Sequence, residues 1–305
     1  MRHESLLKRW LLIFTPPELT PYRECVSESL LRKMSSSLVP LGIEAVSAEF
    51  SPESVDALFA RERPDVVWNC CYGYQDAVTG VTEKQSALCK RLSSFGCPMV
   101  GSPPNVQMLV EDKVLCGVAL SQLDVCTPET LSGGNDLAVV KPRFGSWHRD
   151  VQLINANSVA VERFPATDWI VQPYVHGPEY TVGVVSVEGE PALLTPLRIH
   201  VENEHTPYVR CDGVTSSRIV PDFEDRFALK KLAERIFVGL EMCEFARMDI
   251  RMSNGTPVVL DVNGMPNLEP SVSLLPYAAA VDGWTFSDLI AAIASSAMLR
   301  WNSAE

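Results

Sequence analysis

The chain has 305 residues, of which 46% are hydrophobic and 21% are charged, as expected for an ordered globular protein long enough for two or three domains. Its formal net charge of −12 at pH 7 argues against a nucleic-acid or anionic-membrane surface, because phosphate backbones require a basic footprint. An early apolar run, residues 10–14, is too short to span a bilayer and leads into Pro16-Pro17 instead of a small-residue cleavage site. We therefore expect a cytoplasmic protein with small-molecule partners.

Cysteine usage excludes two further classes of protein. The nine cysteines are an odd number and include the adjacent pair Cys70-Cys71, but they form no CxxC motif. Neither a zinc site nor a disulfide framework is indicated. We expect the cysteines to be reduced and to pack as small apolar side chains.

The first hundred residues alternate predicted strands and helices. The expected strands are 10–14, 44–50 and 65–70, and the expected helices are 22–34, 54–61 and 83–94. Such alternation predicts a parallel, wound sheet, whose ligands bind at the carboxyl ends of the strands. Residues 69–73 are therefore a candidate pocket wall, with an ordinary turn as the alternative. The punctuated segment 101–104 marks a domain boundary.

Two lysines bracket the next part of the chain. Lys113 lies in a helical run at 106–120, and Lys141 lies near the end of the apolar strand 137–142. The loop that follows, 143–148, could fold over phosphates through its backbone amides. It contains one glycine, Gly145, so a plain hairpin connection is the alternative.

The following segments predict further strands, a long loop and two helices. An apolar strand at 169–175 is interrupted by Pro173, so it could hold a purine ring or be an ordinary edge strand. Strands at 180–187 and 193–200 come next. The polar segment 201–217, with Arg210 near its middle, has the length of a lid or binding loop. Amphipathic helices are expected at 222–240, with Phe227 on its apolar side, and at 286–299.

A hairpin at 246–263 carries the main concentration of polar side chains. Alternation places Arg247, Asp249 and Arg251 on one face of its first strand. The same argument places Val259, Asp261 and Asn263 on one face of its second strand. Asn254-Gly255 signals the turn, and a three-residue loop would set Asp249 opposite Asp261. Two carboxylates and a carboxamide suit Mg²⁺, whereas the alternative is an exposed hairpin whose polar face sees water.

Taken in order, these motifs resemble the ATP-grasp superfamily, specifically its D-alanine–D-alanine ligase-like branch. The likeness extends from about residue 65 to residue 280. It includes Asp112-Lys113, Val140-Lys141-Pro142, Gly177-Pro178-Glu179, Arg247-Met248-Asp249, Asp261-Val262-Asn263 and Ser273-Leu274-Leu275-Pro276. The resemblance implies an α/β fold of three domains, a wound parallel N-terminal sheet at 1–103 followed by two α+β lobes, 104–175 and 176–305, that clasp ATP.

The resemblance also implies a role for each candidate residue. Lys113 and Lys141 would contact the nucleotide phosphates, beside a phosphate-covering loop whose remnant is Gly145-Ser146. The adenine and ribose contacts would be Gln172, Val175 and Glu179, with Glu179 accepting from the ribose hydroxyls. Two Mg²⁺ ions would be held by Asp249, Asp261 and Asn263, with Asp261 bridging. The catalytic group would comprise Arg247, Arg210, Asn267 and Ser273.

Within that group the implied functions differ. Arg247 would neutralise charge on the transferred phosphoryl group and the tetrahedral intermediate, and Arg210 stands where the family often has a lysine. Asn267 lies near the position of a glycine that shapes the oxyanion site, and Ser273 begins the segment that receives the substrate carboxylate. A homodimer is compatible with the resemblance.

The chain also departs from the family pattern. The glycine-rich signature with a glutamate is not visible after Phe14, the phosphate loop carries Trp147-His148, and Asp261 replaces the usual glutamate. We expect an ATP-dependent carboxylate–amine ligase that works through an acylphosphate and releases ADP and phosphate. Amino acids or a small peptide of specialised metabolism, such as antibiotic biosynthesis, are the expected substrates. The alternatives are an intramolecular lactam-forming ligase, a small-molecule kinase on the same fold, and a catalytically weak nucleotide-binding protein.

Overall fold

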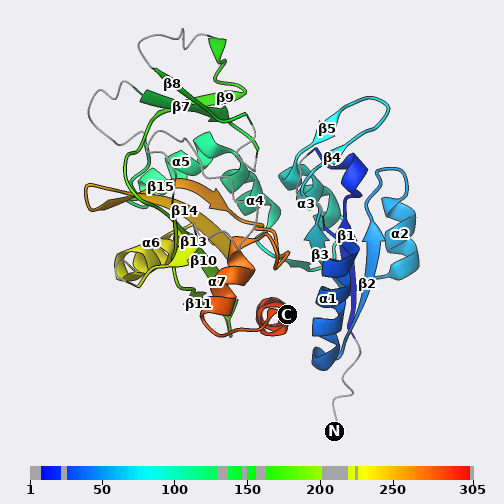
Figure 1. Cartoon of the computed structure of the whole chain (residues 1–305). Coiled ribbons are helices and arrows are strands. Elements are labelled where there is room, and N and C mark those ends of the chain that lie inside the picture. The colour runs from blue at the N-terminus through cyan, green and yellow to red at the C-terminus, as the bar shows by residue number, and fades with distance from the viewer. Residues whose placement is uncertain are drawn as a thin grey trace.

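The computed structural model describes residues 8–21, 26–128, 137–145, 150–155, 163–200, 219–223 and 226–302. Three main sheets organise this part of the chain: a parallel N-terminal sheet, a small antiparallel sheet, and a large antiparallel sheet. Figure 1 shows the N-terminal sheet as a separate layer beside the other two. Within the described residues, no helix is long and apolar enough to cross a membrane.

The N-terminal sheet has the strand order β2-β1-β3-β6, and each neighbouring pair is parallel, which confirms the predicted wound sheet. Its elements are β1 Lys8–Phe14, β2 Ile43–Glu49, β3 Val66–Cys70, β6 Met99–Val100, α1 Glu28–Leu38, α2 Val55–Glu62 and α3 Gln85–Ser93. The pair β4 Tyr74–Gln75 and β5 Thr82–Glu83 forms a short hairpin at its edge, and η1 Pro17–Leu19 and η2 Val39–Leu41 are single 3-10 turns. Side chains of α2 and α3 pack on one face, and α1 packs on the other.

The helix predicted at 22–34 is shifted along the chain. Residues 22–25 lie outside the described part, and α1 begins at Glu28 because the Ser27 hydroxyl accepts a hydrogen bond from the Leu30 N–H at 2.9 Å. This is an ordinary N-cap. The helix continues to Leu38, where Val39-Pro40 leads into a 3-10 turn.

The helical run predicted at 106–120 is two helices, α4 Pro104–Glu111 and α5 Lys113–Gln122. Asp112 has a ψ of 100° and therefore leaves the helical conformation. Its carboxylate accepts hydrogen bonds from the Val114 and Leu115 N–H groups, so it caps the second helix. The break places Lys113 at the first position of α5.

The small sheet has the order β8-β7-β9, with strands β7 Leu137–Pro142, β8 Gln152–Asn155 and β9 Trp169–Pro173. Strand β9 is an edge strand, because within the described residues it pairs with β7 alone. Pro173 therefore removes no ladder hydrogen bond from a central strand.

The large sheet has the order β13-β12-β10-β14-β15, with β11 also paired to β10. Its elements are β10 Glu179–Val187, β11 Glu190–Leu193, β12 Leu197–Ile199, β13 Ile219–Pro221, β14 Phe245–Ser253 and β15 Thr256–Asn263, with helices α6 Arg226–Gly239, α7 Leu274–Val281 and α8 Phe286–Asn302. Helices α4, α5 and α6 cover one face. Helix α7 was not predicted, and Phe227 is wrong as a core residue of α6 because it is 79% exposed.

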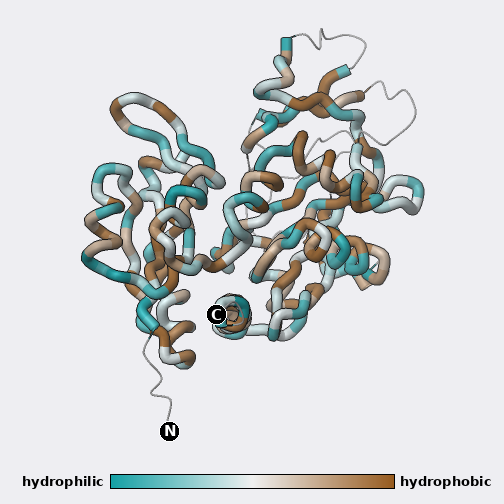
Figure 2. Tube along the Cα trace, turned by 180° about the vertical axis from the view of Figure 1, so that it is seen from behind, coloured by the Kyte–Doolittle hydropathy of each residue, from teal (hydrophilic) through white to brown (hydrophobic). Residues whose placement is uncertain are grey.

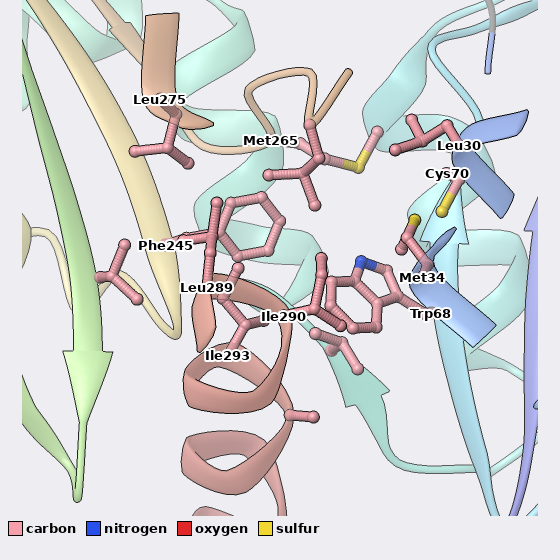
Figure 3. Packing of buried hydrophobic residues seen from close by; sticks show 14 of the residues in the cluster. Leu30, Met34, Trp68, Cys70, Phe245, Met265, Leu275, Leu289, Ile290 and Ile293 are labelled. Carbon is pink, nitrogen blue, oxygen red and sulfur yellow. The ribbon is translucent and has the colours of Figure 1, made fainter. Parts of the chain in front are cut away.

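The C-terminal helix α8 joins the two larger sheets. Ile290 and Ile293 are fully buried in a cluster that contains Trp68 of the N-terminal sheet and Phe245 of the large sheet, as Figure 3 shows. Seen from behind, the helix lies end-on between the two units (Figure 2). The domain limits 1–103, 104–175 and 176–305 stay a prediction, and the last helix of the third range packs against the first.

Candidate active site

The β14–β15 hairpin places the predicted metal ligands side by side. Asp249 lies opposite Asp261, and Arg247 lies opposite Asn263. Directly opposed residues of antiparallel strands have Cβ atoms about 4.5–5.5 Å apart. The two carboxylates and the carboxamide therefore converge on one face at the end of the hairpin.

The register arises differently from the prediction. Ser253 pairs with Thr256, so the loop is the two-residue Asn254-Gly255 turn, with φ values of 51° and 79°, and the three-residue loop is wrong. The pairing shifts between Asp249 and Ile250, which leaves Leu260 as an extra residue, a β-bulge. The bulge brings Asp261 opposite Asp249.

The bulge also changes the face on which Val259 lies. Val259 pairs with Ile250, and both belong to the core beneath α4, α5 and α6. The prediction that Val259 shares a face with Asp261 is therefore wrong. Because the extra residue reverses the alternation, an apolar residue enters the core while the carboxylates remain on the opposite face.

Strand β10 supplies the next row of the same face. Thr181 lies opposite Asp249, and its hydroxyl donates to Asp249 Oδ1 at 2.7 Å. The Arg247 guanidinium donates to the same carboxylate from Nε at 3.2 Å and from Nη2 at 3.1 Å. Gly183 lies opposite Arg247, and a Cβ there would lie 2.5 Å from Leu275 Cδ1, so the close packing of α7 on this face requires a glycine. Asp249 is thus held by two elements before any ligand arrives.

Lys113 brings a positive charge to the hairpin from α5. Its Nζ donates to the Gly145 carbonyl at 2.6 Å and lies 3.8 Å from Asp261 Oδ1. The preceding Asp112 receives two hydrogen bonds from Arg143, at 2.8 and 2.7 Å. Burial raises the pKa of the Asp112 carboxyl, but the Arg143 and backbone hydrogen bonds outweigh it and hold the pKa below its usual value. A permanent ion pair therefore fixes the start of α5 against the loop after β7.

Lys141 reaches the bulge from the small sheet. Its Nζ donates to the Leu260 carbonyl at 2.9 Å. A recess in this region is lined by Lys113, Cys116, Thr127, Lys141, Gln172, Leu260 and Asp261, together with apolar residues of α4, α5 and β15. Burial raises the pKa of the Cys116 thiol to about 12, so it remains protonated and is no nucleophile at neutral pH.

Of the three predicted adenine and ribose contacts, Gln172 lines this recess, and Val175 and Glu179 lie on the chain that leads from β9 into β10. Glu179 is 5% exposed. Its Oε2 accepts from Arg251 Nε at 2.9 Å and from Arg251 Nη2 at 2.7 Å. Arg251 Nη1 donates to the Val175 carbonyl at 2.9 Å. No role was predicted for Arg251 from the sequence.

The loop after β15 is stabilised by its own polar groups. Asn263 Oδ1 accepts from the Met265 N–H at 3.0 Å, and Asn267 Oδ1 accepts from the Glu269 N–H at 2.7 Å, both as Asx turns. The buried Ser273 hydroxyl donates to the Asn267 carbonyl. Asn267 and Ser273 therefore contact each other, and their predicted substrate roles stay predictions.

A second recess lies between the hairpin and the N-terminal layer. It is lined by Gln85, Gln107, Val110, Glu111, Lys113, Gly145, Asp261, Val262, Asn263, Gly264 and Met265. The Glu111 carboxylate caps α3 by accepting from the Gln85 and Ser86 N–H groups at 3.1 and 3.0 Å. Lys84 Nζ lies 3.0 Å from the centroid of the Phe144 ring, a cation–π contact between the N-terminal layer and the loop after β7.

Two predicted site residues, Ser146 and Arg210, lie outside the described residues. Three further residues at the site were not predicted from the sequence: Thr181, Arg143 and Arg251. Alternation along 179–183 could have placed Thr181 beside Asp249, whereas no local signal identifies the partners of the two arginines. Across the described part of the chain, no group of three or more His, Cys, Asp or Glu has metal-ligating geometry, so the donor set here is two carboxylates and an amide.

The sequence and the fold both match known proteins. Residues 110–267, a little over half of the chain, match the model of the ATP-grasp domain. The chain is 33% identical over 280 residues to a D-alanine–D-alanine ligase of Alcanivorax borkumensis, which covers 85% of each chain. It is 24% identical over 282 residues to a D-alanine–D-alanine ligase of Aquifex aeolicus, covering 86% of this chain and 92% of the relative.

Among solved structures, D-alanine–D-alanine ligase of Bacillus anthracis complexed with ATP superposes with a TM-score of 0.70 at 18% identity. The match covers 98% of this chain and all of the other. At that identity it shows a shared fold. Together with the matched domain model, it leads to one assignment: the chain belongs to the ATP-grasp family, as a carbon–nitrogen ligase of the D-alanine–D-alanine ligase-like branch.

Proposed function

We propose that the chain forms an amide between amino acids or small peptides in two steps. In the first, a substrate carboxylate oxygen forms a bond to the γ-phosphorus of ATP, and ADP leaves with the electron pair of the broken P–O bond. In the second, an amine attacks the acyl carbon, phosphate leaves, and the amine nitrogen loses a proton. The resulting amide retains the acyl group of the first substrate.

The opposition of Asp249 to Asp261 and of Arg247 to Asn263 carries this proposal. It gathers oxygen donors and a guanidinium on one face, with Lys113 3.8 Å from Asp261. Phosphoryl transfer depends on positioning and on neutralising oxygen charge. The arrangement supplies both from side chains held by a sheet.

The donor chemistry fits Mg²⁺, which prefers a few carboxylates together with water and substrate phosphates. Asp249, Asp261 and Asn263 would hold two such ions. Asp249 already carries a hydrogen bond from Thr181 and a bidentate pair with Arg247, which fixes its orientation. Bound Mg²⁺ would neutralise charge on the phosphates and on the transferred group.

The remaining residues would bind and orient the substrates. Lys113, Lys141 and the Gly145-Ser146 segment would contact the nucleotide phosphates, and Gln172, Val175 and Glu179 the adenosine. Arg247 and Arg210 would stabilise charge on the reacting group, with Asn267 and Ser273 beside the acceptor. A carboxylate activated as an acylphosphate must be shielded from water, a task that we assign to residues 201–217.

The substrates can be tested by ADP release in the presence of single amino acids, amino-acid pairs and small peptides, with D-alanine alone as one arm. We expect ADP and phosphate to appear in equal amounts with a non-D-alanine pair, and hydroxylamine to trap the activated acid as a hydroxamate. A phosphorylated product without free phosphate would identify a kinase. One peptide that loses water without a second substrate would identify a lactam-forming enzyme, and turnover on D-alanine alone would contradict a specialised role.

Lys141→Ala should weaken ATP binding by about 10- to 100-fold, because it removes a hydrogen bond to a charged phosphate worth ~1.5–3 kcal/mol. It also removes the hydrogen bond that the Lys141 ammonium on β7 donates to the Leu260 carbonyl. Calorimetric titration with ATP and Mg²⁺ measures the change. Lys231→Ala is the matched control, since it deletes the same charge from the exposed side of α6. Equal affinities in the two variants would make Lys141 a structural lysine only.

A further inference from the structure

A buried ion pair lies where the chain passes from the small sheet into the large one. Glu179 and Arg251 are opposed residues of β10 and β14, and Arg251 is 2% exposed. The cost of burying two charges is recovered only when the geometry is good and the remaining donors are satisfied. Here, Nε and Nη2 of Arg251 both bind Glu179 Oε2, while Nη1 binds the Val175 carbonyl.

The same arginine braces the connecting segment. The Arg251 guanidinium carbon lies 4.8 Å from the centroid of the Tyr174 ring, within range of a cation–π contact. The next residue of β14, Met252, donates its N–H to the Pro178 carbonyl at 3.0 Å. A Cβ on Gly177 would lie 1.9 Å from the Met252 carbonyl oxygen, so only glycine permits this approach. Residues 174–179 are therefore held against β14 along their length.

The orientation of Glu179 follows from this geometry. Within the described residues, both hydrogen bonds of its carboxylate go to Oε2, which leaves Oε1 to accept from a ligand. Burial raises the pKa of Glu179 above its usual value, and Arg251 opposes part of that effect. Without a cation beside it, a carboxyl buried to this extent would favour its protonated form. A protonated carboxyl is a poorer acceptor for two neighbouring hydroxyls than a carboxylate is.

We propose that Arg251 is a positioning residue for nucleotide recognition: by binding Glu179 at Oε2 it holds the other carboxylate oxygen toward the ribose, and it fixes the Val175 carbonyl beside the adenine site. This inference rests on the proposed role of Glu179 as the ribose contact. It gives a role in nucleotide binding to Arg251, a residue that would not itself contact the nucleotide. Its effect should therefore be seen in the discrimination between ribose and a sugar without hydroxyls.

The experiment compares calorimetric affinities for ATP and 2′,3′-dideoxyATP. We expect the wild-type chain to prefer ATP by about tenfold or more, the effect of hydrogen bonds to a charged acceptor. Glu179→Gln should reduce that preference to within about threefold, and Arg251→Met should reduce it equally. The preference for ATP in the double variant should be no smaller than in either single variant, because the two residues act as one unit. Arg251→Lys should restore part of the preference, since it keeps the charge but loses the planar fork.

Arg300→Met is the matched control. Arg300 likewise pairs with a buried glutamate: its Nε donates to Glu244 Oε1 at 2.8 Å and its Nη2 donates to Glu244 Oε2 at 3.0 Å, at the junction of α8 with β6 and β14. Its loss should lower the melting temperature without changing the ribose preference. If Arg251→Met does not fold, Arg251→Lys provides the comparison, because it keeps Glu179 intact and loses only the planar fork; an unchanged ribose preference in a folded Arg251→Lys would then overturn the inference.

The results distinguish the positioning role of Arg251 from the ribose role of Glu179, on which it rests. An unchanged preference in Glu179→Gln would overturn the ribose role of Glu179 and the inference with it. Loss of preference in Glu179→Gln but not in Arg251→Met would leave the ribose role standing and overturn the inference alone. Loss of preference in Arg300→Met as well would show that it reports only general destabilisation, which would also overturn the inference.

Discussion

Asp261→Asn is expected to lower kcat by at least about 10²- to 10³-fold, the range for removing one preorganised electrostatic contact in an active site. Asp261 lies opposite Asp249, and its side chain is 34% exposed. The substitution keeps the shape and removes one negative charge, so the proposed Mg²⁺ site would lose one of its charged ligands. The melting temperature should change little, because an isosteric change at a partly exposed position without a packing defect usually costs under about 0.5 kcal/mol.

The measurement is ADP formation at saturating ATP, Mg²⁺ and amino-acid substrates. Asp56→Asn is the matched control: it makes the same isosteric change at an exposed position in the first turn of α2. Product formation at the wild-type rate in Asp261→Asn would remove Asp261 from the metal site. Recovery of the wild-type rate when the Mg²⁺ concentration is raised further would mean that Asp261 contributes to Mg²⁺ affinity and not to the rate of the Mg²⁺-bound enzyme.

Local sequence signals predicted the N-terminal sheet well. Alternating apolar strands and amphipathic helices favour a parallel wound sheet, and β1, β2 and β3 lie within two residues of their predicted limits. The break between α4 and α5 was not predictable in the same way. It depends on the bond of Asp112 to Arg143, a residue whose position relative to the helix is set by the packing of the small sheet.

The site, too, has features that local sequence predicts and features that depend on distant contacts. The opposition of Asp249 and Asp261 was predicted, yet the loop assumed for it was wrong. An Asn-Gly turn favours two residues, and the missing residue is supplied by the bulge at Leu260, whose carbonyl is bound by Lys141. A bulge stabilised by a contact 119 residues away leaves no pattern in the strand itself.

Arg251 shows what alternation could and could not indicate. The period of two correctly placed it on the face of Asp249, since Glu179, Thr181 and Gly183 oppose Arg251, Asp249 and Arg247 in register. Pairing of β10 with β14 was needed to identify Glu179 as its partner. The two-residue period of a strand therefore predicts the face on which a residue lies, but the residue opposite it is known only once the order of the strands is known.

Arg247→Lys is expected to lower kcat and kcat/KM together by at least about 10²-fold, with the KM for ATP changed by no more than a few-fold. The Arg247 guanidinium already holds Asp249 with two of its donors. Its planar fork can also meet two oxygens of a transferred phosphoryl group or an oxyanion, whereas a lysine ammonium supplies only a point charge. A contact that strengthens as charge develops affects the transition state more than the bound substrate.

The bond to Asp249 offers a competing explanation, and the kinetics separate the two. If Arg247 serves only to orient Asp249, Arg247→Lys should raise the Mg²⁺ concentration required for activity, and the rate should recover when Mg²⁺ is saturating. If it acts on the reacting group, the loss persists at saturating Mg²⁺. Arg32→Lys is the matched control, because it makes the same change in an exposed pair with Glu28 on α1, and both kcat and KM should remain at wild-type values. A higher KM for ATP at unchanged kcat in Arg247→Lys would place the guanidinium in ground-state nucleotide binding and contradict its catalytic role.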